Sequence, residues 1–315
     1  MSLRDDLRTS IFKVIEKDPL AGFYASREIK DQILTVLVAG RHLLLEGPPG
    51  TGKTTLAKVI SGLLPEMQVI KGCQFNCSPE KPSCHHCKNL AEIESETITD
   101  RFVRIQGSPE ILPEDLVGDI DPVNAFKYGI DHPLTYRPGK IQKAHRKILF
   151  IDEINRMPEK VQNTFLQVLE EGRTTIAGFD IELEVDTLLI ATANPEEYAG
   201  TERLSANLLD RFECVKIDYP SIEDEIRILK KYANPPFSID IDTYNKITNI
   251  SKNLREGGQF SVRGTISVLE QAAAHAMIHG KDIIDRSDMR VALQNSLKSR
   301  YGDEDIDATI ERVLR

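Results

Sequence analysis

The sequence predicts an α/β fold in which a doubly wound, parallel sheet of five strands is followed by an all-helical domain. Two observations support this prediction. Short apolar runs typical of buried strands alternate with helical patterns up to Pro220, which favours parallel strands joined by crossover helices. Beyond Pro220 the apolar residues recur only with the helical period. The expected strands are Leu43–Glu46, Phe102–Ile105, Ile148–Asp152, Thr187–Ala191 and Cys214–Ile217.

The chain of 315 residues is expected to form two domains. Residues 1–220 make up the α/β core, which begins with helical patterns ahead of the first strand, and residues 221–315 make up the helical domain. A capping-box pattern at Ser221 predicts the start of the first helix in that domain. Further helices are expected at 240–254, 261–279, 286–300 and 304–314.

Three inserts interrupt the predicted core, at residues 71–100, 112–137 and 174–187. The first insert holds four of the five cysteines. Glycines and prolines in the second, including Gly118 and Pro133, favour a β-hairpin or a mobile loop. Alternating apolar residues on either side of Ala177-Gly178 predict a hairpin in the third.

Composition and charge exclude several classes of protein. An apolar fraction of 40% is ordinary for a globular chain, and no stretch approaches the ~20 apolar residues of a membrane-spanning helix. The N-terminal residues mix charges and lack the apolar segment of a secretory signal, so we expect a soluble cytoplasmic protein. The net charge of −9 argues against non-specific binding to nucleic acid.

The first functional motif is a complete phosphate-binding loop between the first strand and a helix. It consists of Gly47, Pro48, Pro49, Gly50, Thr51, Gly52, Lys53 and Thr54, with Thr55 following in the same helix. Glycines allow the backbone N–H groups to approach phosphate oxygens, and the positive end of the helix dipole favours the anion. Lys53 is suited to bind the β- and γ-phosphates, and the Thr54 hydroxyl is suited to ligate Mg²⁺. The motif predicts binding of ATP with Mg²⁺.

The second motif is a pair of carboxylates at the end of the third predicted strand. Ile148–Ile151 is an apolar run suited to a buried parallel strand, and Asp152 and Glu153 follow it. Ligands of α/β sheets bind at the carboxyl ends of the strands. Asp152 is therefore expected to hold Mg²⁺ opposite Thr54, and Glu153 to orient and deprotonate the attacking water. The pair predicts an ATPase rather than a passive nucleotide carrier.

The cysteines of the first insert form a third candidate site. Cys73, Cys77, Cys84 and Cys87 stand within fifteen residues in the pattern C-x₃-C-x₆-C-x₂-C. Four thiolates this close in sequence can bind a tetrahedral Zn²⁺, and an iron–sulfur cluster would use the same ligands. Free thiols or a redox pair are the alternatives. Cys214, next to the fifth strand, is expected to be a small core residue.

Together these motifs resemble those of the AAA+ ATPases, in the branch that contains the ATPase subunit of magnesium chelatase (subunit I) and the MoxR-type ATPases. The phosphate loop and the Asp-Glu pair match the Walker A and Walker B motifs of that family. The other matching segments are Gly72–Cys77, Pro138–Ala144, Leu189–Glu197, Leu208–Phe212 and Ser261–Arg263. Thr192-Ala193 and Asp218–Pro220 are more similar to the MoxR-type proteins.

The resemblance implies roles for three further residues. Asn194, in the sensor-1 segment, would hydrogen-bond the γ-phosphate or the attacking water. Arg211 would be the arginine finger that reaches a neighbouring subunit's nucleotide, with Arg203 and Arg156 as alternatives. Arg263, at the start of a helix, would be sensor 2 and contact the γ-phosphate.

An arginine finger supplied in trans implies a homo-oligomeric ring, usually a hexamer in this family. The alternative for Arg211 is a salt bridge with Asp210 or another nearby acid. The family also implies a partner protein with a von Willebrand factor A-type domain. The expected function is a ring ATPase that remodels a partner for metal insertion, or else a MoxR-type chaperone that matures a metalloenzyme or complex.

Two other functions are weaker expectations. A nucleic-acid motor would need basic residues on its hairpins, but the second insert carries four aspartates, including Asp115 and Asp119, against Lys127 and Arg137. A regulatory scaffold that only binds nucleotide would not need Glu153.

Overall fold

The structure is a computed structural model that describes residues 2–129, 135–175, 182–194, 204–256, 260–301 and 306–314. The chain divides into two compact units. The first unit comprises Met1–Phe23, Arg27–Gly47 and Lys53–Lys216. The second comprises Tyr24–Ser26, Pro48–Gly52 and Ile217–Arg315. Within the described ranges, every helix is too short or too polar to cross a bilayer.

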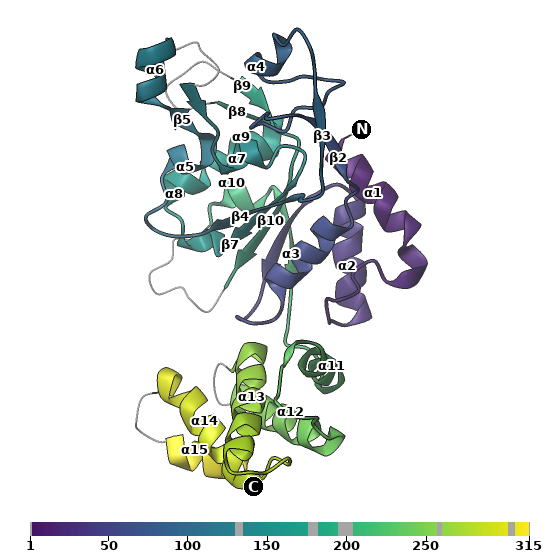
Figure 1. Ribbon diagram of the computed structural model, residues 1–315, viewed down its shortest axis with the longest axis vertical. Helices are drawn as coiled ribbons and strands as arrows, with labels where there is room; N and C mark the ends of the chain where they lie inside the picture. The colour runs from purple at the N-terminus through teal and green to yellow at the C-terminus, as the bar shows by residue number, and fades with distance from the viewer. Residues whose placement is uncertain are drawn as a thin grey trace. The chain divides into compact units, whose positions relative to one another are not determined.

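A five-stranded sheet forms the centre of the first unit (Figure 1). Its order is β11-β1-β10-β7-β4, and every neighbouring pair is parallel. The strands are β1 (His42–Glu46), β4 (Phe102–Gln106), β7 (Ile148–Asp152), β10 (Leu188–Ala193) and β11 (Phe212–Lys216). The three inner strands are almost completely buried, because helices cover both faces. The five predicted strands are confirmed, with ends that differ by one or two residues.

Helices pack on both faces of the sheet. Helix α2 (Arg27–Val38) contacts β1 and β11, and helix α3 (Lys53–Gly62) contacts β7. On the other face, the strand residues Leu149 and Ile151 share a hydrophobic cluster with Ile141 of α7 (Lys140–Lys143) and Phe165 of α9 (Thr164–Glu171). Other helices of the first unit are α1 (Leu3–Lys13), α8 (Glu159–Gln162) and α10 (Ala206–Leu209). Two 3₁₀ turns lie at Ile15–Lys17 and Ile154–Arg156.

The segment around the first insert contains two strands that the sequence analysis did not predict. Strands β2 (Met67–Ile70) and β3 (Ser95–Ile98) pair in antiparallel register, and the short helix α4 (His85–Lys88) lies between them in sequence. The cysteine cluster belongs to the chain between these strands.

The other two inserts also contain antiparallel strand pairs. In the second, β5 (Asp119–Ile120) pairs with β6 (Tyr136–Arg137), and helices α5 (Pro113–Val117) and α6 (Pro122–Tyr128) flank β5 in sequence. In the third, β8 (Arg173–Thr175) pairs with β9 (Glu182–Glu184). Pro133 and the Ala177-Gly178 turn lie outside the described residues.

The second unit is helical beyond residue 221, as predicted. Its helices are α11 (Ile222–Tyr232), α12 (Ile241–Glu256), α13 (Val262–Ile278), α14 (Arg286–Tyr301) and α15 (Ile306–Val313). The Ser221 hydroxyl caps α11 by accepting from the Asp224 amide at 3.1 Å. A buried ion pair between Arg255 and Glu225, with contacts of 2.8 and 2.6 Å, ties α12 to α11.

The prediction that Cys214 is a small core residue is wrong. Cys214 is exposed. It lies on β11, which is an edge strand of the sheet, and an edge strand has a neighbour on one side only.

Candidate nucleotide site and cysteine cluster

The predicted phosphate-binding loop connects β1 to α3 (Figure 1). Gly47, Gly50 and Gly52 have φ values of 150°, 79° and 87°, a region that favours glycine, so the sequence of the loop and its backbone agree. Lys53 is the first residue of α3, and its Nζ donates to the Gly47 carbonyl at 2.7 Å. The lysine side chain therefore folds back over the start of the loop.

The remaining loop residues have local roles. The Thr51 hydroxyl donates to the Pro48 carbonyl at 3.0 Å, which stabilises the turn. Thr54 and Thr55 lie in the first turn of α3, where backbone N–H groups have no partner within the helix. The Thr54 hydroxyl is a hard oxygen ligand of the kind that Mg²⁺ prefers.

The second motif lies at the carboxyl end of β7, and a threonine on the next strand fixes it. Thr192 of β10 donates from Oγ1 to Asp152 Oδ1 at 2.9 Å and accepts from the Glu153 amide at 2.8 Å. Thr192 is buried, with 1% of its surface exposed. One hydroxyl group thus positions both the carboxylate of Asp152 and the backbone of Glu153.

The backbone at Glu153 is unusual. Glu153 has φ 56° and ψ 54°, the left-handed region, which a non-glycine residue adopts at a cost of about 1–3 kcal/mol when the surroundings hold it there. Its Oε2 accepts from Gln106 Nε2 at 3.1 Å and from Arg156 at 3.0 Å. Such strain is typical of functional positions.

Gly107 allows the end of β4 to approach this backbone closely. Its amide donates to the Asp152 carbonyl at 2.6 Å. A Cβ at Gly107 would lie 2.0 Å from the Glu153 carbonyl oxygen, a contact that no side chain can make. Only glycine fits at position 107 with the present positions of Asp152 and Glu153.

Arg104 makes a contact with this site that the sequence analysis did not predict. It lies on β4, and its guanidinium contacts Asp152 Oδ2 at 2.6 Å and Gln106 Oε1 at 2.8 Å. The Arg104 side chain is 49% exposed and that of Asp152 is 18% exposed. The carboxylate expected to hold Mg²⁺ is therefore paired with a half-exposed cation.

Asn194 follows directly after β10, so it lies at the same edge of the sheet as Asp152 and Glu153. It is buried, and its carbonyl accepts from Asn155 Nδ2 at 3.4 Å. The sheet therefore places this predicted sensor beside the carboxylate pair, in the same unit.

Arg211 is held by acids in this single chain. Its guanidinium donates to Asp210 at 3.2 Å, to the Asn207 carbonyl at 3.0 Å, and to Glu170 of α9. The side chain is 30% exposed. The alternative salt bridges considered for this arginine are thus present, and the guanidinium lies at the surface.

The other predicted arginines differ in their surroundings. Arg156 contacts Glu153, as described above, so it belongs to the carboxylate pair of its own chain. Arg203 lies outside the described residues. Arg263 is the second residue of α13 in the second unit and is exposed, and Ser261 caps this helix by accepting from the Gly264 amide at 3.2 Å.

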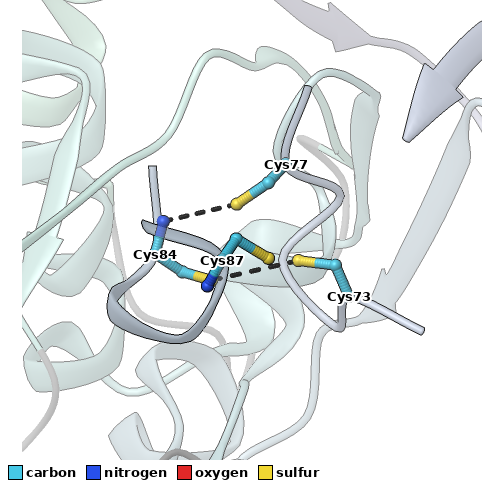
Figure 2. A group of neighbouring side chains, drawn as sticks. All are labelled: Cys73, Cys77, Cys84 and Cys87. Carbon is cyan, nitrogen blue, oxygen red and sulfur yellow. Dashed lines mark hydrogen bonds between the residues drawn. The ribbon is translucent and has the colours of Figure 1, made fainter. Parts of the chain in front are cut away.

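The four cysteines of the first insert form a compact cluster (Figure 2). The Sγ atoms of Cys73, Cys77, Cys84 and Cys87 all lie within 4.8 Å of one another. Cys73 is half-buried and the other three are buried. Figure 2 shows the side chains converging from two short stretches of backbone, one with Cys73 and Cys77 and the other with Cys84 and Cys87.

The cluster favours a cation over four free thiolates. Burial raises the pKa of Cys87 to about 12. Hydrogen bonds from the Cys73 and Cys84 thiols lower the pKa of Cys77. Four thiolates can therefore form together only if a positive charge lies among them.

Family models match two consecutive parts of this chain. Residues 24–77 match the model described as magnesium chelatase, subunit ChlI, and residues 81–214 match the ATPase family associated with various cellular activities (AAA). The first match includes the phosphate-binding loop, and the second includes Asp152, Glu153, Asn194 and Arg211.

Curated relatives agree with these models. A magnesium-chelatase subunit ChlI homologue of Methanocaldococcus jannaschii is 27% identical, over 82% of this chain and 78% of the relative. A magnesium-chelatase 38 kDa subunit of Acidiphilium rubrum is also 27% identical, over 86% of this chain and 88% of the relative.

The chain resembles the AAA+ ATPases of the magnesium chelatase branch. A solved structure agrees in fold: a chain in a complex between subunits BchI and BchD of magnesium chelatase has a TM-score of 0.52 and 22% identity, covering 94% of this chain and 99% of that one. The five-stranded parallel sheet, the phosphate-binding loop and the helical C-terminal part are the AAA+ architecture that the motifs predicted.

Four residues at this site were not predicted to act there, namely Arg104, Gln106, Gly107 and Thr192. In the sequence, Thr192 marks only a difference between two kinds of relative. The signal that connects all four is strand register, because β4 pairs with β7 and β7 with β10, which brings their carboxyl ends together. Register is fixed by the folded sheet and is not visible in a single sequence.

Proposed function

We propose that this chain is a Mg²⁺-dependent ATPase that hydrolyses ATP to ADP and phosphate. The observation that carries the proposal is the Thr192 hydroxyl, which holds Asp152 and Glu153 at the end of β7 through bonds of 2.9 and 2.8 Å. The strand between this pair and the phosphate loop is β10, which pairs with both β7 and β1. Similarity to AAA-family ATPases supports ATPase activity in general.

Each side chain has a distinct task in the proposed reaction. Lys53 binds the β- and γ-phosphates through its ammonium group, together with the amides of the loop 47–54. Glu153 orients the attacking water and accepts its proton, and Asn194 positions the water or the γ-phosphate. The donor set of Thr54 and Asp152 consists of hard oxygens, which fits Mg²⁺. When bound, Mg²⁺ neutralises charge on the phosphates.

Replacing Glu153 by glutamine tests this assignment. The amide keeps the size of the side chain but cannot accept a proton, so turnover should fall by about 10²–10⁴-fold. Binding of ATP should persist, because the phosphate-binding loop is unchanged. Lys53→Ala is the matched variant and should lose binding as well as turnover. Equal ATP turnover by the Glu153→Gln and unchanged chains, each measured at several protein concentrations, would refute the assignment.

We further propose that the ATPase works as a homo-oligomeric ring, with Arg211 completing the nucleotide site of a neighbouring subunit. Arg211 lies next to β11 on the surface of the first unit, and Glu170 and Asp210 hold its guanidinium. A planar guanidinium can stabilise charge on the transferred phosphoryl group. Arg263, at the start of α13, is proposed to contact the γ-phosphate as the second sensor. A hexamer is the ring size that the family resemblance implies.

The proposed role of the ring is to remodel a partner protein for metal insertion. Its support is the similarity to proteins named as magnesium-chelatase subunits. The proposed partner carries a von Willebrand factor A-type domain. A MoxR-type role, in which the ring matures a metalloenzyme or complex, is favoured by Thr192-Ala193 at the end of β10.

Trapping the complex distinguishes these roles. The Glu153→Gln chain, loaded with ATP, should retain its partner because hydrolysis no longer releases it. Mass spectrometry of the retained proteins would then identify the partner. A chelatase-like subunit with a von Willebrand factor A-type domain supports metal insertion into a tetrapyrrole, whereas a metalloenzyme supports the MoxR-type role. Recovery of nucleic acid instead, with turnover stimulated by DNA, would contradict both.

A further inference from the structure

We propose that Cys73, Cys77, Cys84 and Cys87 bind one structural Zn²⁺, and that this ion holds the three inserts of the ATPase core together as one body. The site lies outside the residues assigned to nucleotide binding and hydrolysis. Its donor set consists of four sulfur atoms, which is the set that structural zinc sites use.

The spacing of the sulfur atoms favours a single ion over a cluster. With Zn–S bonds of about 2.3 Å, the edge of a tetrahedron of sulfurs is about 3.8 Å. Cys73 Sγ and Cys84 Sγ are 4.0 Å apart, and all four sulfurs lie within 4.8 Å of one another. An iron–sulfur cluster distributes its cysteines over two or four irons, which requires sulfurs that are farther apart.

Backbone amides around the sulfurs prepare them for negative charge. The Cys84 amide donates to Cys77 Sγ at 3.3 Å, and the Cys87 amide donates to Cys84 Sγ at 3.4 Å (Figure 2). The Ser83 amide also donates to Cys77 Sγ, at 3.4 Å. Four thiolates around Zn²⁺ carry a net charge of −2, and such donors offset it in a buried site.

All three inserts meet at this cluster. The buried cysteines share a hydrophobic cluster with Leu183 of β9, in the third insert, and Tyr136 of β6, in the second, packs against it. Phe75 and Leu90 add the apolar side chains of the first insert. A segment of about thirty residues is too small to bury a sufficient core of its own, so a metal ion would supply the missing folding free energy.

Polar contacts attach the same segment to the rest of the first unit. Asn76 Nδ2 donates at 3.0 Å to the carbonyl of Lys143, the last residue of α7. Lys81 Nζ contacts Glu184 Oε2 of β9 at 3.1 Å. The loop that carries the cysteines therefore contacts β9 through this exposed ion pair as well as through Leu183. Loss of the ion should loosen all three inserts together.

Metal analysis of the purified full chain is the first test. We expect one zinc per chain by inductively coupled plasma mass spectrometry. Zinc content should fall at least tenfold in Cys84→Ser and stay unchanged in Cys214→Ser, whose cysteine is exposed on β11. Cys73→Ser, at the half-buried ligand, is the second variant if Cys84→Ser does not fold. A chain that contains no metal, or iron in place of zinc, would overturn the proposal.

Thiol reactivity and hydrogen exchange test the structural role in the unmodified chain. A thiol reagent should modify at most one cysteine, Cys214, while zinc is bound, and all five after zinc is removed with a chelator. Amide exchange should then accelerate in β2–β3, β5–β6 and β8–β9 together, while the β1, β7 and β10 amides stay protected. Acceleration limited to residues 71–100 would contradict the idea that the ion joins the inserts. Neither measurement depends on ATP hydrolysis, so this proposal and the proposed function can fail separately.

Discussion

Replacing Thr192 by valine should damage the hydrolytic site without disturbing nucleotide binding. Valine has the shape of threonine but no hydroxyl, so the change removes the two hydrogen bonds to Asp152 and to the Glu153 amide. Thr192 is 1% exposed, so water has little access to replace the hydroxyl. A carboxylate oxygen and a backbone N–H then lose their partner.

The size of the effect follows from these contacts. A buried polar group left without a partner costs about 1–3 kcal/mol, so two groups should lower local stability by about 2–6 kcal/mol. The hydrogen bonds also set the position of Glu153. A displacement near 1 Å at a reacting group costs about 10²-fold in rate, so we expect a fall in kcat of that order. The Kd for ATP should change little, because residues 47–54 are untouched.

Two measurements on Thr192→Val test this reasoning. Hydrogen exchange at the β7 and β10 amides reports local stability, and steady-state ATP hydrolysis reports kcat. Thr192→Ser is the matched control, because serine keeps the hydroxyl and loses only a methyl group. Normal turnover in the valine variant, with unchanged amide protection, would refute the positioning role of Thr192. A serine variant as inactive as the valine variant would also refute it.

Three further outcomes are expected. Burial lowers the pKa of His42 from 6.5 to about 3, so at pH 5 the unfolded chain binds a proton that the folded chain does not. Lowering the pH from 7.5 to 5 should therefore cost about 2 kcal/mol of stability through this histidine. Urea unfolding of the sheet should show a weaker pH dependence in His42→Gln. Gly107→Ala should abolish turnover, because its Cβ would lie 2.0 Å from the Glu153 carbonyl oxygen; a variant with normal kcat would contradict the close approach. Arg104→Gln frees Asp152 from its ion pair, so half-maximal turnover should need several-fold less Mg²⁺. An unchanged Mg²⁺ titration would show that Arg104 does not compete with Mg²⁺ for Asp152.

The sequence predicted the parts of the fold that depend on local pattern. Strands such as Ile148–Asp152 are apolar throughout because both faces of the sheet are covered, and this makes them visible as short runs. The phosphate-binding loop is visible because its backbone needs glycine at fixed positions. Strands β2 and β3 were missed because they are four residues long, and β3 is largely exposed.

The contacts that complete the site depend on strand pairing and could not be predicted. Gln106 lies opposite Asp152 in the register of β4 and β7, and this places Arg104 and Gly107 at the carboxylate pair. Nothing in the residue types of β4 indicates that neighbour. The cysteine cluster was predicted from spacing alone, but its packing against Leu183 and Tyr136 required the folded chain.

Mixing two inactive variants tests the central claim most directly, namely that ATP bound by one subunit is hydrolysed with an arginine from the next. Glu153→Gln chains supply Arg211 but lack the base, and Arg211→Ala chains supply the base but lack the arginine. In a randomly mixed ring, about a quarter of the sites combine an intact Glu153 with a neighbour's intact Arg211.

We expect the equimolar mixture to regain about a quarter of the turnover of the unchanged ring, if the sites act independently. A mixture of Lys53→Ala and Glu153→Gln chains is the control, since both changes affect the same side of the interface and no complete site can form. No recovery in the first mixture, or full turnover by Arg211→Ala alone, would contradict a site shared between subunits.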